Sequence, residues 1–399
     1  MDLREAAHTL LKANRRKTRD GRMYTVPSPS TYPYQWLWDS CFHSIVLAKL
    51  EPEAAKDELR SLLSRQLPDG MVPHMIFWKP KFIRPYHLWW GKEGVSSITQ
   101  PPMLAYAAWE IYQETKDVAF LKEVFPQLLS FYKYLIEQRD PHDHHLISII
   151  NPDESGEDNS PRFDIAMRVK SNISFFSHMY KRHQLVTMNR TCGFDPLVCM
   201  HERFWVKDVP FNSILVKNLE RLAQIAKVLG DSEAEKFATL NHDLIAFTMR
   251  EYLMADGVFW SAIGLEHGHL KVATWAHFAP LFAGIYTREE AVQLMHTHFN
   301  NTETFRSPFG IRTVSKQESS YRPKGFWRGP IWFAPHWFIY KGLMDYGLTQ
   351  EARWLGDTSI ALIEKHGFRE YFDPETGKPC GAHSFTWGTL VLDMMQRHE

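Results

Sequence analysis

Paired helical segments, with a long loop before alternate helices, dominate this chain of 399 residues. Apolar residues recur at helical spacing through most of the sequence, and few segments alternate as a strand does. The sequence predicts helices at residues 2–16, 40–50, 52–66, 103–114, 117–138, 171–184, 211–229, 232–252, 272–285, 287–299, 326–346, 349–366 and 384–397. The absence of a short sequence repeat argues against an open solenoid. We therefore predict an all-α fold, a toroid of helix pairs forming one domain over residues 1–399, with the loops of one rim lining a central funnel.

The loop at residues 151–164 is the most acidic of these connections. Five carboxylates fall between positions 153 and 164, and Gly156 and Pro161 interrupt any continuous helix. The β-branched apolar run at 146–150 leads into the loop and predicts a buried strand. A polar loop with a buried lead-in is well suited to present a carboxyl group to a ligand, whereas the structural alternative is a solvated acidic loop.

Composition excludes several kinds of partner. Lysine plus arginine equals aspartate plus glutamate at 46 each, so no excess charge favours nucleic acid or an acidic lipid surface. No apolar stretch is long enough to cross a membrane, and the charged N-terminus lacks a secretory signal. The four cysteines have neither metal nor redox spacing, which predicts reduced thiols in a cytoplasmic protein. The 14 tryptophans indicate a surface that stacks on rings.

The run His142-Asp143-His144-His145 is the only histidine-rich tract that suggests a metal site. Its spacing fits no closed zinc site, and a polar turn before the apolar run is the simpler interpretation. We therefore expect neither a metal nor an organic cofactor.

Five aromatic or acidic blocks follow one another along the chain. They are Gln35-Trp36-Leu37-Trp38-Asp39, Thr99-Gln100-Pro101-Pro102, Glu154 to Asp164, Phe326-Trp327-Arg328-Gly329-Pro330-Ile331-Trp332 and Glu370 to Gly377. Together these blocks resemble the signature blocks of glycoside hydrolase family 63. The resemblance is greatest to a compact bacterial branch that includes mannosylglycerate and glucosylglycerate hydrolases. The acidic loop is also similar to that of family 37 trehalases.

The resemblance implies an (α/α)6 barrel and an inverting α-glycosidase. It places the general acid on Asp158 and the general base on Glu370, which only the fold can bring together. Hydrolysis of an acetal needs both, one to protonate the departing oxygen and one to activate water. Like charges at Glu154, Glu157 and Asp164 are expected to raise the pKa of Asp158, and aromatic burial adds to that.

The resemblance also implies the first sugar subsite. Its members are Trp36, Trp38, Asp39, Gln100 and Trp327. Trp387 supplies a further ring for stacking. An anionic aglycone, the non-sugar part of the substrate, would need a cationic or hydroxyl-rich second subsite. The candidates for that subsite are Tyr32, Tyr34, His74, Lys79, Arg84, Tyr86 and Arg190.

Two arginines near the blocks have an ambiguous role. Arg162 and Arg328 can each bind a substrate group, since a guanidinium pairs with a carboxylate in bidentate geometry. The structural alternative is an internal ion pair, such as one from Arg328 to Glu154 or Asp164, that orders the acidic loop.

The sequence therefore predicts an enzyme that hydrolyses a small α-glucoside or α-mannoside, such as glucosylglycerate or mannosylglycerate. A trehalase or a short-oligosaccharide α-glucosidase is the alternative among hydrolases. A sugar-binding or sensor protein is disfavoured because Asp158 and Glu370 are both present, and an epimerase because the blocks lack histidine. The expected partner is a small sugar, and a homo-oligomer stays open.

Overall fold

The computed structural model describes residues 2–79, 90, 92–140, 142–202 and 204–395. An inner ring of helices forms its centre, and each member contacts the next around the ring. The members are α2 (Leu37–Leu50), α5 (Leu104–Thr115), α9 (Val209–Leu229), α11 (Ala279–Ala283), α13 (Phe333–Asp345), and the 3-10 turn η5 (Thr386–Leu390) with α15 (Val391–Met395). Contacts between η5 and α2 close the ring. The predicted toroid of helices is confirmed.

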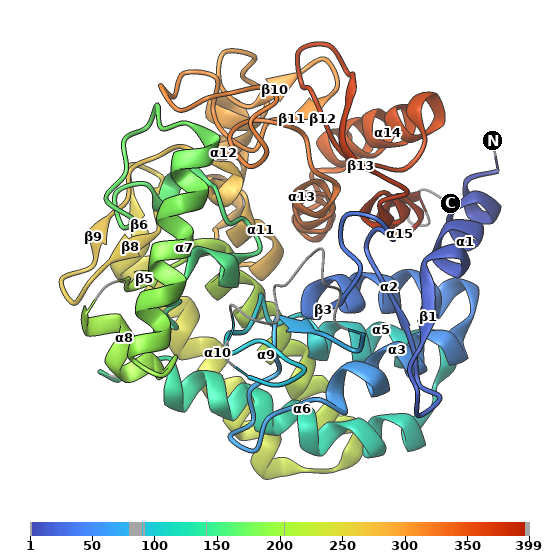
Figure 1. Cartoon of the computed structure of the whole chain (residues 1–399). Helices are drawn as coiled ribbons and strands as arrows, with labels where there is room; N and C mark the ends of the chain where they lie inside the picture. Colours follow the sequence, from blue (N-terminus) through green and yellow to red (C-terminus); the bar gives the residue numbers. More distant parts are fainter. Residues whose placement is uncertain (1, 80–89, 91, 141, 203, 396–399) are drawn as a thin grey trace.

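A second layer of helices packs outside the ring. Its members are α1 (Leu3–Asn14), α3 (Pro52–Leu63), α6 (Val118–Gln138), α10 (Ser232–Leu253), α12 (Arg288–Leu294) and α14 (Thr349–His366). In Figure 1 the chain runs from α1 and α2 around the ring to α14 and α15, so that both chain ends lie on the same side. The helices therefore alternate between the inner and outer layers along the sequence, as the pairing predicts.

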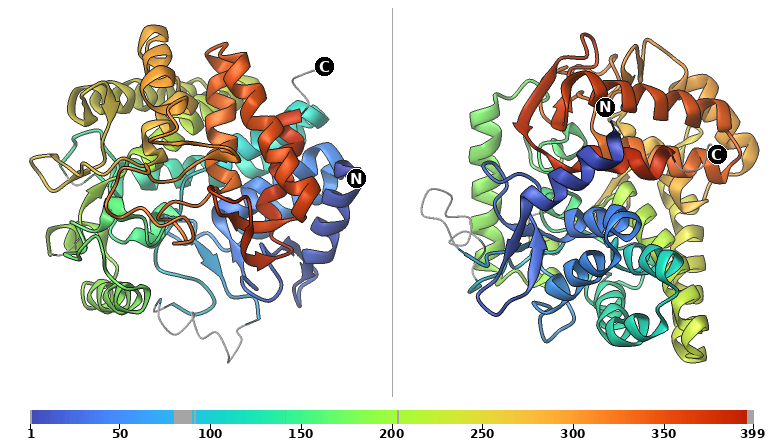
Figure 2. Two further views of the ribbon diagram at one scale, coloured as in Figure 1. Left: turned by 90° about the horizontal axis from the view of Figure 1, so that it is seen from above. Right: turned by 90° about the vertical axis from the view of Figure 1, so that its right-hand side faces the viewer.

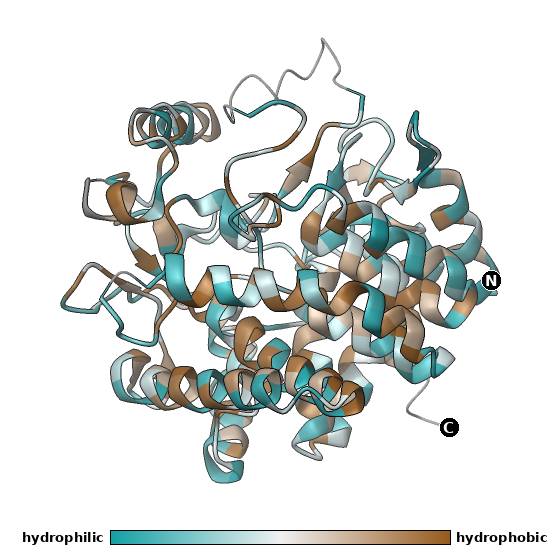
Figure 3. Cartoon of the chain, turned by 90° about the horizontal axis from the view of Figure 1, so that it is seen from below, coloured by the Kyte–Doolittle hydropathy of each residue, from teal (hydrophilic) through white to brown (hydrophobic). Residues whose placement is uncertain are grey.

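Hydrophobicity explains which helix takes which layer. In α2 every residue from Leu37 through Ala48 is buried, and α13 is buried from Phe333 through Leu343. A helix that is apolar on all sides must be surrounded by protein. The outer helix α3 instead buries one face and leaves Glu53 exposed, and Figure 3 shows hydrophilic and hydrophobic residues mixed along the peripheral helices.

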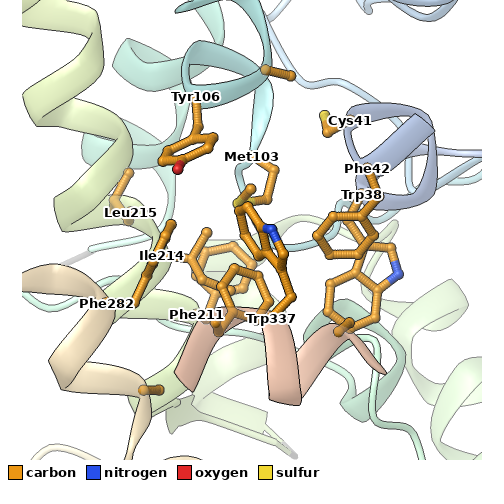
Figure 4. Close-up of a cluster of buried hydrophobic side chains, with 14 of the residues drawn as sticks. Trp38, Cys41, Phe42, Met103, Tyr106, Phe211, Ile214, Leu215, Phe282 and Trp337 are labelled. Carbon is orange, nitrogen blue, oxygen red and sulfur yellow. The ribbon is translucent and has the colours of Figure 1, made fainter. Parts of the chain in front are cut away.

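Aromatic rings fill the centre of the toroid (Figure 4). Trp337 of α13 lies with ring centroids 5.5 Å from Tyr106, 5.6 Å from Phe282 and 6.0 Å from Phe42. These rings come from four inner helices, so their packing joins segments that are distant in sequence. The indole Nε1 of Trp337 donates a 2.8 Å hydrogen bond to Asp393, which satisfies its buried polar atom.

Short strands occur in the loops that connect the helices. The pairs are β1 (Arg15–Lys17) with β2 (Met23–Thr25), β3 (Gln35–Trp36) with β4 (Met75–Ile76), β6 (Met254–Ala255) with β7 (Val258–Phe259), β10 (Arg306–Ser307) with β11 (Gly310–Ile311), and β12 (Arg369–Phe372) with β13 (Pro379–His383). β8 (Ala262–Ile263) joins β5 (Val206–Lys207) to β9 (Gly268–His269). All of these pairings are antiparallel.

Several predicted elements differ from the structure: the helix predicted at 326–346 begins only at Phe333, and the one predicted at 171–184 extends to Thr191. The run at 146–150 is buried but forms only an isolated bridge, from Ile149 to Val206. The predicted helix at 272–285 begins late, because Thr274 bridges to Val314 and Pro280 stands at the start of α11. A proline fits the first turn of a helix and not its interior.

Two further helices, α7 (Phe175–Thr191) and α8 (Pro196–Glu202), belong to neither layer. Figure 2 shows α7 standing outside the ring. A disulfide between Cys192 and Cys199 joins the two helices, so the expectation of four reduced thiols is wrong for this pair. Their Cα atoms lie 5.6 Å apart across a short turn, a proximity that sequence spacing alone did not reveal. No helix among the described residues is long and apolar enough to span a membrane.

Candidate active site

A cavity of about 510 Å³ opens at the end of the ring where the inner helices begin. Its lining comprises Pro27, Tyr32, Trp36, Trp38, Asp39, Gln100, Asp153, Gly156, Asp158, Phe326, Trp327, Trp332, Glu370, Phe385 and Trp387. Seven of the nine predicted substrate-binding residues and both predicted catalytic carboxylates are among them.

The acidic loop is held by buried ion pairs on both sides of Asp158. Glu154 lies 2.7 Å from Arg139, and its carboxylate also accepts hydrogen bonds from the backbone N–H groups of Thr99 and Ile150. These contacts fix the loop against the chain segment that precedes α5. Beyond Asp158, the side-chain oxygen of Asn159 accepts a 2.9 Å hydrogen bond from the N–H of Trp327, which ties the loop to the opposite wall.

Gly156 sits where the loop passes over the indole of Trp38. Its φ is +73°, and a Cβ at this position would collide with the Trp38 ring. Glycine is therefore required here both for the left-handed conformation and for the close approach. This turn places Asp158 at the cavity wall.

Asp158 has two unlike oxygens. Oδ2 lies 2.7 Å from Nη2 of Arg182, whereas Oδ1 is buried without a hydrogen-bond partner among the described residues. Burial and the charge of Asp153 raise the pKa of Asp158 to about 6, although Arg182 acts in the opposite direction. The expected repulsion from Glu154, Glu157 and Asp164 is wrong as the cause, because each of these is paired with an arginine.

Glu370 lies on β12 and is almost completely buried. Its Oε1 accepts a 2.6 Å hydrogen bond from the hydroxyl of Tyr32, and its Oε2 accepts one of 2.5 Å from the N–H of Ala382. Burial raises its pKa above the ordinary value, these two hydrogen bonds lower it, and the charge of Asp158 raises it. Tyr32 therefore contacts the predicted base directly.

Asp39 occupies the first turn of α2 at the cavity wall. Its Oδ1 accepts a 2.7 Å hydrogen bond from Nε1 of Trp387, so its side chain is directed toward the site. Burial raises its pKa to about 6, while His43 and the Trp387 hydrogen bond lower it. Gln100 stands beside it, and its Oε1 lies 3.5 Å from the N–H of Trp38.

Indole rings form much of the remaining wall. Trp327 stacks on Trp332 with centroids 4.0 Å apart and planes 7° from parallel, and Trp332 stacks in turn on Tyr371. Trp332 therefore both packs against its neighbours and lines the cavity. The Nε1 of Trp36 is buried without a hydrogen-bond partner among the described residues, which leaves a donor for a ligand.

Arg162 and Arg328 do not line the cavity, and both are engaged in buried ion pairs. Arg162 lies 2.7 Å from Glu157 and 2.8 Å from Asp208, and Arg328 lies 2.5 Å from Asp164. All of these side chains are buried. The structural alternative stated for both arginines is the one that the structure supports: they hold the acidic loop in place.

The structure places the candidates for a second subsite in different surroundings. Tyr34 and His74 are buried away from the cavity lining, Lys79 and Arg190 are exposed, and Arg84 and Tyr86 lie outside the described residues. A cation that contacts one of the predicted catalytic carboxylates was missed. Arg182 of α7 contacts Asp153 and Asp158. No signal in the sequence marked it, since it stands outside the five blocks on a helix of mixed polarity.

The histidine-rich run forms a turn, as predicted. Within the described part of the chain, Asp140, Asp143 and His145 are the one group whose ligand atoms could share a metal ion. Asp140 already accepts hydrogen bonds from the N–H groups of His144 and His145, and none of the group lines the cavity. It contributes nothing to the candidate active site.

Residues 32–388 match the profile of a family described as the mannosylglycerate hydrolase MGH1-like glycoside hydrolase domain. A mannosylglycerate hydrolase of Thermus thermophilus is 32% identical over 92% of this chain and 95% of that protein. A glucosylglycerate hydrolase of Mycolicibacterium hassiacum is 28% identical, with 93% and 94% covered.

Solved structures agree with these sequence relatives. The crystal structure of a GH63 mannosylglycerate hydrolase from Thermus thermophilus in complex with Tris and D-glycerate matches with a TM-score of 0.89 and 30% identity. The match covers 99% of this chain and all 100% of that one. A neutral trehalase from Saccharomyces cerevisiae shares the fold alone, at a TM-score of 0.65 and 16% identity over 98% of this chain and 80% of that chain.

Proposed function

The chain belongs to the mannosylglycerate hydrolase MGH1-like glycoside hydrolases of family 63, and from this membership we propose that it hydrolyses an α-hexosyl glycerate with inversion at the anomeric carbon. One observation carries the proposal: Asp158 and Glu370, which come from opposite parts of the sequence, line one cavity walled by indole rings. Indole faces and carboxylates are the groups that bind a hexose.

Asp158 is proposed as the general acid. Its proton passes to the glycosidic oxygen while the bond from that oxygen to the anomeric carbon breaks. The raised pKa, about 6, supports this role, since an acid near neutrality balances protonation against donating strength. Its unpaired Oδ1 leaves an oxygen available for the substrate.

Glu370 is proposed as the general base. It removes a proton from a water molecule, whose oxygen bonds to the anomeric carbon on the face opposite the departing group. Burial raises the pKa of Glu370 above its ordinary value, and the hydrogen bonds from Tyr32 and Ala382 oppose that rise by stabilising the ionised form. The products are the hexose with inverted configuration and the free glycerate.

Asp39, Gln100 and the indoles are proposed as the sugar subsite. A buried carboxylate such as that of Asp39 accepts charge-assisted hydrogen bonds from hydroxyl groups, and Trp36 offers a donor through Nε1. The stack of Trp327 and Trp332 presents a flat apolar wall for a hexose ring.

The aglycone is proposed to carry a carboxylate. The relatives named above act on glycerate conjugates, and one of them was crystallised with D-glycerate. Arg182 supplies a positive charge beside Asp158, where the departing group must lie. A trehalose or oligosaccharide aglycone is neutral and gains nothing from that charge, so we rank a trehalase lower.

A substrate panel tests this proposal. Mannosylglycerate, glucosylglycerate, trehalose, kojibiose and nigerose are incubated with the enzyme, and NMR follows the first product anomer. We expect turnover of at least one hexosyl glycerate with release of the β-hexose. Preferred turnover of trehalose, or initial release of the α-anomer, contradicts the proposal.

Replacing either carboxylate tests the assigned roles. Asp158→Asn and Glu370→Gln are each expected to lower kcat by at least about a hundredfold, the size of a general acid or base contribution, without loss of folding. Glu303→Gln, on the exposed surface, serves as the matched control and should retain full activity. Near-normal turnover by a folded Asp158→Asn or Glu370→Gln enzyme removes that residue from the mechanism.

A further inference from the structure

We propose that Arg182 couples the binding of the substrate's carboxylate to the protonation of Asp158, so that the general acid is loaded with its proton only when an anionic aglycone is bound. Arg182 is thereby a positioning and specificity-determining residue that acts on the reaction through Asp158. The inference rests on the proposed function and deepens it.

Arg182 is shared between two acids of the acidic loop. Its Nη2 lies 2.5 Å from Asp153 and 2.7 Å from Asp158, and its Nε lies 3.4 Å from Asp153. Its side chain is 17% exposed, and the Asp158 side chain is 22% exposed, so solvent and a ligand can reach the group. A single guanidinium thus contacts two carboxylates of the cavity wall, although Arg182 itself is not among the lining residues.

The other titratable groups nearby do not change this balance near neutral pH. His74 and His178 both feel the charge of Arg182, and burial lowers the pKa of each to about 3, so both are neutral. Arg328 is paired with Asp164, while Glu370 interacts with Asp158 across the cavity.

A third carboxylate adds negative charge that the single guanidinium does not balance. Two acids and one guanidinium already carry an excess of one negative charge when both acids are ionised. A glycerate that binds Arg182 adds another negative charge in a partly buried site, where like charges repel strongly. One acid must then become neutral, and the proton comes from solvent. Asp158 is the acid that takes it, because burial already favours its protonated form.

The coupling meets a need of the mechanism. With a pKa of about 6, only a minor fraction of Asp158 carries the proton at pH 7 in the free enzyme, so the fraction that can act as the acid is small. Binding of an anionic substrate raises that pKa further and supplies the proton when it is required. A neutral glycoside lacks this effect and is cleaved slowly, so the device also selects the substrate.

Isothermal titration calorimetry measures the number of protons that the enzyme takes up when glycerate binds. D-glycerate is titrated into the wild-type enzyme at pH 7 in buffers of different ionisation enthalpy, and the slope of apparent enthalpy against buffer enthalpy gives the protons taken up. We expect more than about half a proton per glycerate bound, given the fraction of Asp158 that is ionised at this pH. Asp158→Asn should bind glycerate with no uptake. Binding to the wild type without uptake overturns the proposal.

A second measurement uses variants of α7. Arg182→Met removes the cation, and Lys181→Met removes the same charge from the neighbouring, exposed position. The substrate here is a hexosyl glycerol, the neutral counterpart of the hexosyl glycerate. With it, the decline of kcat/KM at high pH (the basic limb of the pH profile) should move to higher pH in Arg182→Met, because Asp158 no longer has a cation beside it that favours its ionised form. Lys181→Met should leave the limb in place.

With a hexosyl glycerate, Arg182→Met should raise KM at least about tenfold, a loss of about 1.4 kcal/mol in binding, whereas Lys181→Met should not. An unchanged basic limb in Arg182→Met overturns the coupling even where hexosyl glycerates are substrates. If no hexosyl glycerate is hydrolysed by the wild type, the proposed function itself is wrong, so the two failures are distinct.

Discussion

At the scale of single residues, Asp39 combines a structural cost with a proposed use. It is 4% exposed, and burial holds its pKa at about 6. An acid whose pKa is raised on folding stabilises the protein below its unfolded pKa and loses that contribution as pH rises through the folded pKa. Near pH 7 the ionised, buried Asp39 therefore lowers the stability of the fold, which is expected of a group kept for binding.

Asp39→Asn should separate these effects. Between pH 4 and pH 7, the free energy of unfolding of the wild type should fall by about 2 kcal/mol relative to that of the variant, since one pKa unit is worth about 1.4 kcal/mol. The variant should also lose at least about tenfold in kcat/KM, because the sugar hydroxyls lose a charged acceptor. Denaturant unfolding at both pH values measures the stability difference, and steady-state kinetics on the same preparation measure kcat/KM. Unchanged kinetics place Asp39 outside the sugar subsite.

Most of the cavity residues that the sequence identified lie in short blocks of residues that are adjacent in the chain. Trp36, Trp38 and Asp39 are examples, and all line the cavity. Arg182 could not be found in this way, because its relation to Asp158 arises only from the placement of α7. The role of Arg162 stayed ambiguous because a buried ion-pair arginine and a substrate arginine look alike in sequence.

At the scale of elements, the acidic loop is a rigid support for Asp158. Arg139 and Arg162 approach it from the chain before and within it, and both are buried. Arg162 also reaches Asp208, the N-cap of α9, so the loop is anchored to an inner helix of the ring. The proposed acid thus gains its position from ion pairs that lie outside the cavity lining.

Arg162→Met should cost about 3–5 kcal/mol of stability, because it leaves Glu157 and Asp208 buried without their cation. Arg22→Met is the matched control: its pair with Asp20 is exposed, and such pairs contribute less than about 1 kcal/mol. Chemical denaturation of both variants gives the comparison. Equal, small losses would show that the buried network does not hold the loop.

Helices were predictable where the helical spacing of apolar residues extends over many residues. Prediction failed where contacts with distant parts of the chain determine the local conformation. α9 and α10 follow the predicted helices to within a few residues, since their apolar positions and aspartate caps are visible in sequence. The segment at 272–285 also contains many apolar residues, but its strand-like bridge to Val314 depends on a distant partner. Local patterns cannot encode that partner.

At the scale of the whole molecule, contacts between the two ends of the sequence close the ring. The side-chain amide of Asn14 donates hydrogen bonds to the carbonyl groups of Pro27 and Ser384, at 3.3 and 2.9 Å. The N–H of Thr386 donates to the same Pro27 carbonyl. These bonds align the last helical segment with the first, and Trp387 then reaches Asp39.

Asn14→Ala should therefore cost about 1–3 kcal/mol, since it removes a buried amide and the bonds that it donates to these carbonyl groups. Gln113→Ala, which removes only an exposed contact to Lys116, should change stability by less than about 0.5 kcal/mol. Denaturant unfolding measures both, and hydrogen exchange should show faster opening of the backbone at 383–390 in Asn14→Ala alone. Unaltered exchange there would mean that other contacts close the ring.

The position of α7 outside the ring has a consequence for how such an enzyme can diversify. Under the proposed function, the hexose is recognised by walls assembled from the whole circumference, so a new sugar preference demands coordinated change in distant segments. The departing group is recognised by one helix that carries little of the core. Substitutions in this helix can therefore change which acid is accepted as the departing group, while the residues that bind the sugar stay the same.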